Sequence, residues 1–246
     1  MNYILIPVFN ESQNIPNLYE ELKTVVSGKD YLIVFSDDGS SDNTGEVIKS
    51  TFASLPFYIV GDGINRGPGE AFNAGFEYIL SQSKSSDDVV ITLEADCTSD
   101  ITLLPKMIAI NKLGFNLILA SVYAQGGGFS KTTFMRKLIS SLANLMFRFL
   151  FDIKILTLSS FYRLYSVDLL RRIKEKNGQI ITEAGFICML EILVKAIFQE
   201  AKIIEIPMML HSDKRKGKSK MKIMKTSWQY LKFFAKWKMF KKAKAN

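Results

Sequence analysis

The sequence is poor in the residues that build many catalytic and metal centres. Among its 246 residues there is one histidine, His211, and two cysteines, Cys97 and Cys188, which lie far apart. One histidine excludes a zinc centre made of histidine and cysteine ligands, and no serine–histidine–aspartate triad can be assembled around it. The cysteines form neither a CxxC pair nor a dense disulfide framework, so we expect two reduced thiols.

Long apolar runs are also absent. Although 48% of the residues are hydrophobic, no uninterrupted apolar stretch reaches the eighteen or so residues of a membrane-spanning helix. The N-terminal sequence MNYILIPVFNE lacks the basic region, the long apolar core and the cleavage site of a signal peptide. We therefore expect a cytoplasmic chain that buries a sizeable core and has no transmembrane helix.

Acidic residues are missing from the last part of the chain. Residues 214–246 contain thirteen lysines or arginines and no acid, whereas the first 213 residues hold all 24 acids and 19 basic residues, a net charge of −5. Aromatic residues are interleaved with these lysines, at Trp228, Tyr230, Phe233, Phe234 and Trp237. This pattern suits an anionic membrane surface and, as an alternative, single-stranded nucleic acid.

The first 120 residues alternate between two periodicities. Amphipathic segments of helical spacing separate short β-branched or aromatic runs at 3–9, 31–36, 57–61, 89–95 and 116–122. Such runs are typical of strands covered on both faces, and Gly28 follows the first amphipathic segment as a natural helix cap. A repeated strand–helix order predicts an α/β fold with a mostly parallel central sheet and helices on both faces.

Polar clusters follow the first four predicted strands. They read PVFNE, SDDGSSDNT, GINRGPGEA and EADCTSD. Ligands of parallel α/β sheets bind at the carboxyl ends of the strands, so we expect the four clusters to meet in one site.

The fourth cluster contains two acids, Glu94 and Asp96. An i, i+2 pair on extended backbone projects both side chains to the same side, where two carboxylates repel unless a cation lies beside them. Mg²⁺ or Mn²⁺, which prefers oxygen ligands and also binds diphosphate, is the expected cation. The alternative is a pair of solvated carboxylates at a strand end.

These clusters, in this order, resemble the nucleotide-sugar-binding core of family 2 glycosyltransferases with the GT-A fold, and in particular the dolichyl-phosphate and polyprenyl-phosphate mannose synthases. The resemblance runs from about Tyr3 to about Met221. It implies a Rossmann-like catalytic domain over residues 1–220 with amphipathic interfacial helices. From its lysines and aromatic residues we expect residues 221–246 to be a basic aromatic tail that contacts an anionic membrane surface and is dispensable for donor binding. No nucleic acid partner is expected.

The resemblance also implies a donor site for a nucleoside diphosphate sugar, either GDP-mannose or UDP-glucose. Thr98 stands where these synthases often supply a further polar metal ligand beside Asp96. Glu94 replaces the usual aspartate, and its longer side chain reaches either the metal, a metal-bound water or the ribose. The expected donor-binding residues are Pro7, Phe9, Glu11, Asp38, Gly67, Glu94, Ala95, Asp96 and Lys220.

Two parts of this donor site have a purely structural alternative. The segment NRGPGEAFNAG lacks a Walker lysine, so close backbone packing is favoured over a phosphate cradle for Gly67 and Gly69. For Asp42, helix capping is favoured over nucleotide binding.

The catalytic residues implied by the resemblance are Asp96, Arg136, Lys214 and Arg215. A metal at Asp96 would act as a Lewis acid on the leaving diphosphate. Lys214 or Arg215 would meet that diphosphate from a mobile closing loop, and Arg163 is either structural or near it.

A second amphipathic helix is predicted at 134–151. Its apolar side either packs on the core or, as the resemblance implies, lies at the membrane interface. Arg136 and Ser140 of this helix match acceptor-phosphate residues of the mannose synthases, whereas Val122 replaces an arginine of that family.

A polyprenyl monophosphate is already an anionic nucleophile near neutral pH and needs no general base. We therefore expect an inverting hexosyltransferase that acts on a polyprenyl phosphate and lies peripherally on the inner face of the membrane. One alternative is a family 2 enzyme with a saccharide or other lipid acceptor, which would need Glu183 or Glu191 as base. Another is a non-catalytic membrane or nucleic-acid-binding protein.

Overall fold

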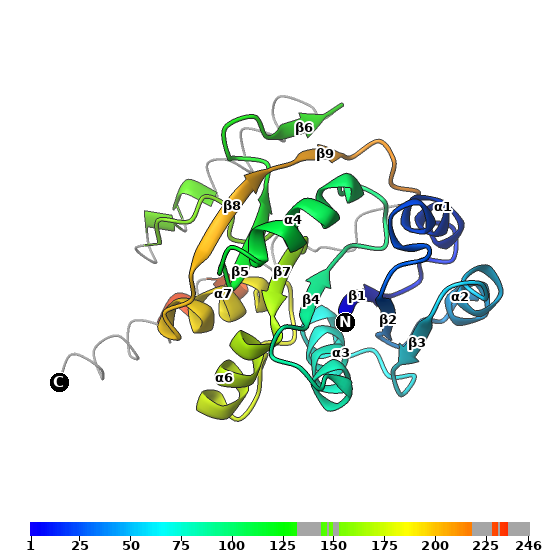
Figure 1. Ribbon diagram of the computed structural model, residues 1–246, viewed down its shortest axis with the longest axis horizontal. Helices are drawn as coiled ribbons and strands as arrows, with labels where there is room; N and C mark the ends of the chain where they lie inside the picture. The colour runs from blue at the N-terminus through cyan, green and yellow to red at the C-terminus, as the bar shows by residue number, and fades with distance from the viewer. Residues whose placement is uncertain (132–143, 147, 150–152, 218–227, 231, 236–246) are drawn as a thin grey trace.

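The computed structural model describes residues 1–131, 144–146, 148–149, 153–217, 228–230 and 232–235. A seven-stranded sheet in the order β3-β2-β1-β4-β7-β5-β8 forms its centre (Figure 1). The strands are β1 (Asn2–Val8), β2 (Tyr31–Asp37), β3 (Phe57–Val60), β4 (Val89–Thr92), β5 (Leu117–Ser121), β7 (Arg163–Ser166) and β8 (Ile203–Pro207). β7 is antiparallel to β4 and β5, and the other neighbours are parallel, which confirms the mostly parallel sheet.

Side chains of β1 alternate between the two faces of the sheet. Tyr3 and Leu5 join one hydrophobic cluster, and Ile4, Ile6 and Val8 join the other. This is the period of two expected for a strand, and burial on both faces explains why the predicted runs are apolar throughout.

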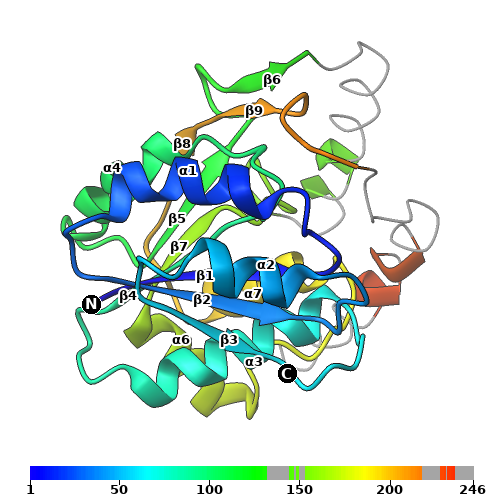
Figure 2. The same cartoon turned by 90° about the vertical axis from the view of Figure 1, so that its right-hand side faces the viewer.

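Helices cover both faces, as predicted (Figure 2). One cluster is closed by α1 (Ile15–Val26), α2 (Thr44–Thr51), the 3-10 turn Ile101–Leu103 and α4 (Leu104–Asn111). The other is closed by α3 (Pro68–Gln82), α6 (Val167–Asn177) and α7 (Cys188–Phe198). A small parallel sheet of β6 (Gly128–Ser130) and β9 (Met209–His211) lies at one end of the molecule.

Two local expectations about α1 and the cysteines are confirmed. α1 ends at Val26, and Gly28 follows with φ +68°, a left-handed conformation that suits glycine. Cys97 and Cys188 are both free and buried, and burial raises the pKa of the Cys97 thiol to about 12. Neither thiol is ionised near neutral pH, so both are inert core residues.

The fourth strand is shorter than the apolar run that predicted it. β4 ends at Thr92, and the chain leaves the sheet before Glu94. A turn then carries Asp96 and brings Cys97 to φ +61°. The expectation that the two acids converge because they lie on extended backbone is therefore wrong, and the turn brings them together instead.

The C-terminal segment packs on the protein where the structure describes it. Residues 228–230 and 232–235 are helical, and Tyr230 and Phe233 are only 6% and 9% exposed within the cluster that includes α7. The prediction that the aromatic rings of the tail lie at a membrane surface is wrong for these two, because rings buried in the core cannot enter a headgroup layer. Trp228, by contrast, is 59% exposed.

No helix among the described residues combines the length and the apolar composition needed to cross a bilayer. The predicted site residues Arg136, Ser140 and Lys220 lie outside the described residues.

Phe233→Ala should lower the free energy of unfolding by about 3 kcal/mol, because it removes a buried ring and leaves a cavity. Trp228→Ala is the matched control on the same helix, and its cost should stay below about 1 kcal/mol. Urea denaturation followed by circular dichroism measures both. If both variants lose an equally small amount of unfolding free energy, the C-terminal helix does not pack on the core in solution.

Candidate active site

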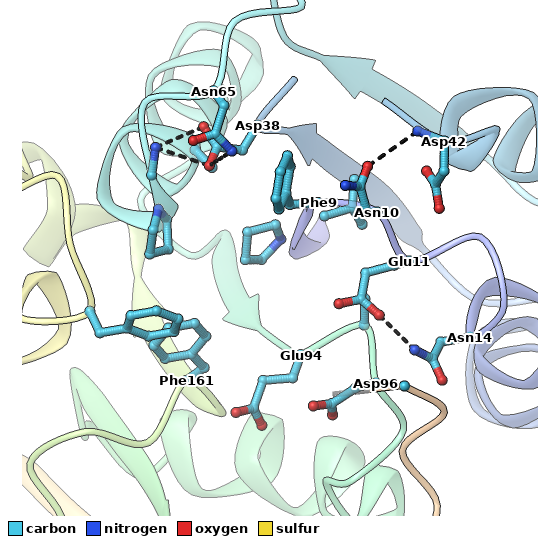
Figure 3. A pocket seen from close by; sticks show the side chains of 18 of the residues that line it. Phe9, Asn10, Glu11, Asn14, Asp38, Asp42, Asn65, Glu94, Asp96 and Phe161 are labelled. Carbon is cyan, nitrogen blue, oxygen red and sulfur yellow. Dashed lines mark hydrogen bonds between the residues drawn. The ribbon is translucent and has the colours of Figure 1, made fainter. Parts of the chain in front are cut away.

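A cleft of about 730 Å³ opens at the carboxyl ends of β1, β2 and β4 (Figure 3). Segments that follow the first four strands all line it, so the four polar clusters meet as expected. The predicted site residues in its lining are Pro7, Phe9, Glu11, Asp38, Gly67, Glu94, Ala95, Asp96 and Arg215. Thr98 and Lys214 are described but do not line it.

Asp38 is engaged by the loop that follows β3. Its carboxylate accepts hydrogen bonds from the backbone nitrogens of Arg66 (2.7 Å) and Gly67 (2.9 Å) and from Nδ2 of Asn65 (3.2 Å). Asp38 therefore fixes the loop 65–67 at the mouth of the cleft. Because the Gly67 N–H points to Asp38, it is not directed at a phosphate in this arrangement.

Gly69 is required by close packing. Its N–H donates to the carbonyl of Ala184 (2.8 Å), and a Cβ built on Gly69 would overlap the carbonyl of Glu183. The start of α3 is thus pressed against the segment 183–184. This geometry supports the packing interpretation of NRGPGEAFNAG.

Loops after β1 and β2 are joined by a hydrogen-bond network at the other end of the cleft. The side-chain oxygen of Asn10 accepts from the backbone nitrogens of Ser41 (2.7 Å) and Asp42 (3.2 Å). Asp42 in turn accepts from the backbone nitrogen of Thr44 (3.0 Å), in the first turn of α2. Asp42 therefore has the helix-capping role that we expected, and it also lines the cleft.

Glu94 and Asp96 lie together in the cleft, and their carboxylates approach each other in Figure 3. Oδ1 of Asp96 accepts from Oγ1 (2.7 Å) and the backbone nitrogen (3.1 Å) of Thr98, and Oδ2 accepts from Nε of Arg215 (2.6 Å). A second guanidinium nitrogen of Arg215 also contacts Oδ2. Thr98 is buried outside the cleft lining, so its position favours orienting Asp96 over ligating a metal.

The acid pair is electrostatically unfavourable without a cation. Burial, together with the charge of Asp96, raises the pKa of Glu94 to about 7, against the opposing effects of a hydrogen bond from Ser99 and the charge of Arg215. The Arg215 guanidinium is the cation that neutralises Asp96 in this arrangement. A hard divalent cation would supply this positive charge, and carboxylate oxygens are the ligands that such a cation prefers.

Protein ligands for such a cation are few. Within the described ranges, no group of three histidine, cysteine, aspartate or glutamate side chains is close enough to hold a metal by itself. Glu94 and Asp96 would therefore hold it together with ligands that the protein does not supply, such as diphosphate oxygens and water.

The structure separates the two basic residues that the sequence left as alternatives. Lys214 pairs with Glu21 of α1 (2.7 Å), outside the cleft lining, whereas Arg215 reaches Asp96 inside it. Arg163 is fully buried and donates to the carbonyls of Ser160, Met189 and Leu158. Its role in this structure is therefore to hold the surrounding backbone.

Glu191, considered above as a base, is saturated by hydrogen bonds. Its carboxylate accepts from the backbone nitrogens of Thr182 (3.0 Å) and Glu183 (2.8 Å) and from the Thr182 hydroxyl, and it pairs with Lys195 (2.8 Å). Neither Glu183 nor Glu191 lines the cleft. Glu191 instead holds the segment from which Ala184, Gly185 and Phe186 reach the cleft wall.

Sequence reasoning missed one wall of the cleft. Phe161, residues 184–186 and Gln229 form it, and the rings of Phe161 and Phe186 stack with centroids 5.7 Å apart. Phe161 precedes a strand and Gln229 belongs to the basic tail, so no local motif marked either residue. Only the tertiary packing of α7 and the C-terminal helix brings them to the site.

In EDTA, Glu94→Gln should raise the melting temperature by a few degrees more at pH 8 than at pH 5. The folded-state pKa of about 7 lies above the ordinary 4.5, so the stability that Glu94 contributes is present at low pH and is lost as the pH rises through about 7. Glutamine is neutral at both pH values. Thermal unfolding of wild type, Glu94→Gln and the surface control Glu20→Gln measures this, and an equal increase at both pH values would contradict the raised pKa.

Comparison with known proteins agrees with this geometry. A family model described as glycosyl transferase family 2 matches residues 3–174. The dolichol-phosphate mannosyltransferase of Pyrococcus furiosus is 29% identical over 232 residues, which is 93% of this chain but 61% of that protein, so the chain spans less than two thirds of its length. The polyprenol monophosphomannose synthase of Mycolicibacterium smegmatis is 26% identical over 220 residues, 89% of this chain and 80% of that protein.

Solved structures share the fold at low sequence identity. Glucosyl-3-phosphoglycerate synthase from Mycobacterium tuberculosis, in complex with UDP, superposes with a TM-score of 0.63 at 14% identity and covers 96% of this chain and 79% of that one. Its complex with Mn²⁺, UDP and glucosyl-3-phosphoglycerate gives a TM-score of 0.61, also at 14% identity, over 92% of this chain and 75% of that one. The architecture is therefore the GT-A fold, and since the family model covers most of its length, the chain belongs to glycosyl transferase family 2.

Proposed function

We propose that the protein transfers a hexose, mannose or glucose, from a nucleoside diphosphate sugar to a polyprenyl phosphate. The observation that carries this proposal is the acid pair Glu94 and Asp96, held with Arg215 in a cleft at the carboxyl ends of the sheet. Relatives that match most of this chain are named for mannosyl transfer to dolichol or polyprenol phosphates, which supports the same acceptor class here.

The donor would lie along the cleft with its diphosphate at the acid pair. Phe9, Asn10 and Asp42 line one end, where a flat ring, an amide and a carboxylate suit a nucleoside. A Mg²⁺ or Mn²⁺ ion held by Glu94 and Asp96 would supply Lewis-acid stabilisation of the leaving diphosphate. Arg215 would add a fixed positive charge for the same group.

An anionic acceptor is favoured over a saccharide because the cleft lacks the expected base. Both candidate glutamates lie outside its lining, and Glu191 already accepts several hydrogen bonds and an ion pair. A phosphate monoester needs no proton removed near neutral pH. Direct attack on the sugar carbon, with no enzyme nucleophile, would invert its configuration.

A lipid acceptor is supported by an exposed apolar helix face. Leu145, Met146 and Phe149 are exposed on one side of the helical residues 144–146 and 148–149. On the other side Asn144 donates to the carbonyl of Leu156, and Arg148 donates to the carbonyl of Lys154 (3.2 Å). A helix that turns its polar side inward and its apolar side outward suits the interface of a membrane.

We therefore propose peripheral attachment at the cytoplasmic face of a membrane. The assignment of Arg136 and Ser140 to the acceptor phosphate, and of the lysines within residues 221–246 to the anionic surface, belongs to the same proposal.

Transfer should require Asp96 and a divalent cation. Asp96→Asn should lower turnover at least about 100-fold, since it weakens charge stabilisation of the diphosphate by several kcal/mol. Asp100→Asn, in the same loop but outside the cleft lining, should retain turnover. Labelled GDP-mannose and UDP-glucose, each with Mn²⁺ and a polyprenyl phosphate, provide the assay. Full turnover in excess EDTA, or full turnover by the Asp96→Asn variant, would contradict the assignment of a divalent cation to Glu94 and Asp96.

Vesicle binding should depend on the exposed side chains of Leu145, Met146 and Phe149. The double variant Leu145→Ser, Phe149→Ser should release most of the protein from phosphatidylglycerol vesicles in a sedimentation assay, because it removes apolar area that would be buried in the headgroup region. Leu113→Ser is the matched control, since Leu113 is 78% exposed just after the end of α4 and should not affect sedimentation. Unchanged sedimentation of the double variant would place the attachment elsewhere.

A further inference from the structure

Gln229 brings an unpartnered amide to the wall of the cleft. Its side chain lines the cleft and is half-buried. No group in the described part of the chain hydrogen-bonds to it, although most polar side chains around the cleft are paired, as Asp38, Asn10 and Asn14 illustrate. A polar side chain that faces a cleft without a protein partner has its hydrogen-bonding capacity available for a ligand.

Gly185 makes room for this amide. A Cβ built on Gly185 would lie 2.7 Å from the amide carbon of Gln229, and closer still to its oxygen and nitrogen. The amide therefore lies against the bare Cα of Gly185. The φ of Gly185 is outside the left-handed region, so this glycine is required by the contact with Gln229 and not by its own backbone conformation.

Buried neighbours fix the position of Gln229. Tyr230 follows it directly, Phe233 lies one helical turn further on, and both rings are in the hydrophobic core. Gly185 is held from the other side, because Glu191 binds the backbone of residues 182 and 183 and Ala184 accepts from Gly69. The two sides of this contact are thus anchored independently.

The chemistry of this wall suits sugar hydroxyls. Like a hydroxyl, an amide both donates and accepts hydrogen bonds and carries no charge. Phosphate is better matched by a cationic group, such as the guanidinium of Arg215 beside the acid pair. Phe186, next to Gly185, stacks on Phe161, and this pair offers a flat apolar surface beside the amide. In Figure 3 Phe161 lies beside Glu94, on the opposite side of the view from Asn10 and Asp42.

We propose that Gln229 hydrogen-bonds hydroxyls of the hexosyl group of the donor and thereby contributes to donor recognition. The proposal rests on the proposed function, because it takes the diphosphate to lie at Glu94 and Asp96. A nucleoside at the end marked by Asn10 and Asp42 then leaves the sugar at the wall of Phe161, Phe186 and Gln229. A residue of the basic tail is in this way a part of the substrate site.

Equilibrium binding separates recognition of the sugar from recognition of the nucleotide. Affinities for GDP-mannose, UDP-glucose, GDP and UDP are measured with Mn²⁺ by calorimetry for the full chain. Gln229→Ala should weaken binding of the preferred nucleotide sugar by about threefold to tenfold, as expected for one or two neutral hydrogen bonds. Its affinity for the matching nucleoside diphosphate should stay within twofold of wild type.

Gly185→Ala provides a second variant that leaves Gln229 in the chain. The added Cβ displaces the amide, so the same selective loss is expected. The double variant should lose no more than Gln229→Ala alone, because both changes remove one contact. Lys232→Ala, an exposed position on the same helix, is the matched control and should bind as wild type does.

Three results would overturn the inference. Equal weakening of nucleotide sugar and nucleoside diphosphate would assign Gln229 a structural role. If both single variants bind the nucleotide sugar with wild-type affinity, Gln229 does not recognise the sugar. The same conclusion follows if the wild-type protein binds the nucleotide sugar and the nucleoside diphosphate equally well. A wild type that binds neither nucleotide sugar would instead refute the proposed function.

Discussion

Two carboxylates at the end of β4 need positive charge, and Arg215 supplies it from a loop more than a hundred residues away in the sequence. Thr98 holds one oxygen of Asp96, and Arg215 holds the other. The same loop is tied down on both sides of Arg215, since the backbone nitrogen of His211 donates to the carbonyl of Thr98 (2.8 Å) and Lys216 exchanges hydrogen bonds with Asn14. Neutralising the acid pair therefore also joins the loops after β1, β4 and β9 into one cleft.

Much of the fold was predictable because its signals are local. The five apolar runs of the first 120 residues are strands. Four of them, β1, β2, β4 and β5, are largely buried, and burial on both faces of a sheet leaves a continuous hydrophobic segment. The antiparallel strand β7 was not predicted. It has only four residues and contains the buried Arg163, whose guanidinium donates to the nearby carbonyls of Ser160 and Leu158 and to the more distant carbonyl of Met189, contacts that a sequence pattern does not reveal.

The candidate site was predictable on the side formed by the strand-end clusters and not on the opposite side. Asp38, Glu94 and Asp96 follow strands and are marked by strand-end clusters, although the turn at 95–96 replaces the extended backbone expected there. Phe161, Gly185 and Gln229 meet only through packing of α7 and the C-terminal helix. The sequence after residue 227 interleaves lysine with aromatic residues, and this pattern fits a membrane surface as well as a protein core. Only the observed burial of Tyr230 and Phe233 decides between the two for these residues.

The order of the site along the chain has a consequence for its biosynthesis. Everything from Pro7 to Asp96 leaves the ribosome well over a hundred residues before Gln229, and Arg215 also comes late. A nascent chain therefore carries the acids of the site long before their counter-charge and the opposite wall exist. Cleavage by a protease just before the C-terminal helix would leave the acids of the cleft and Arg215 in the chain, but it would remove Gln229 and open the cleft at that wall to water.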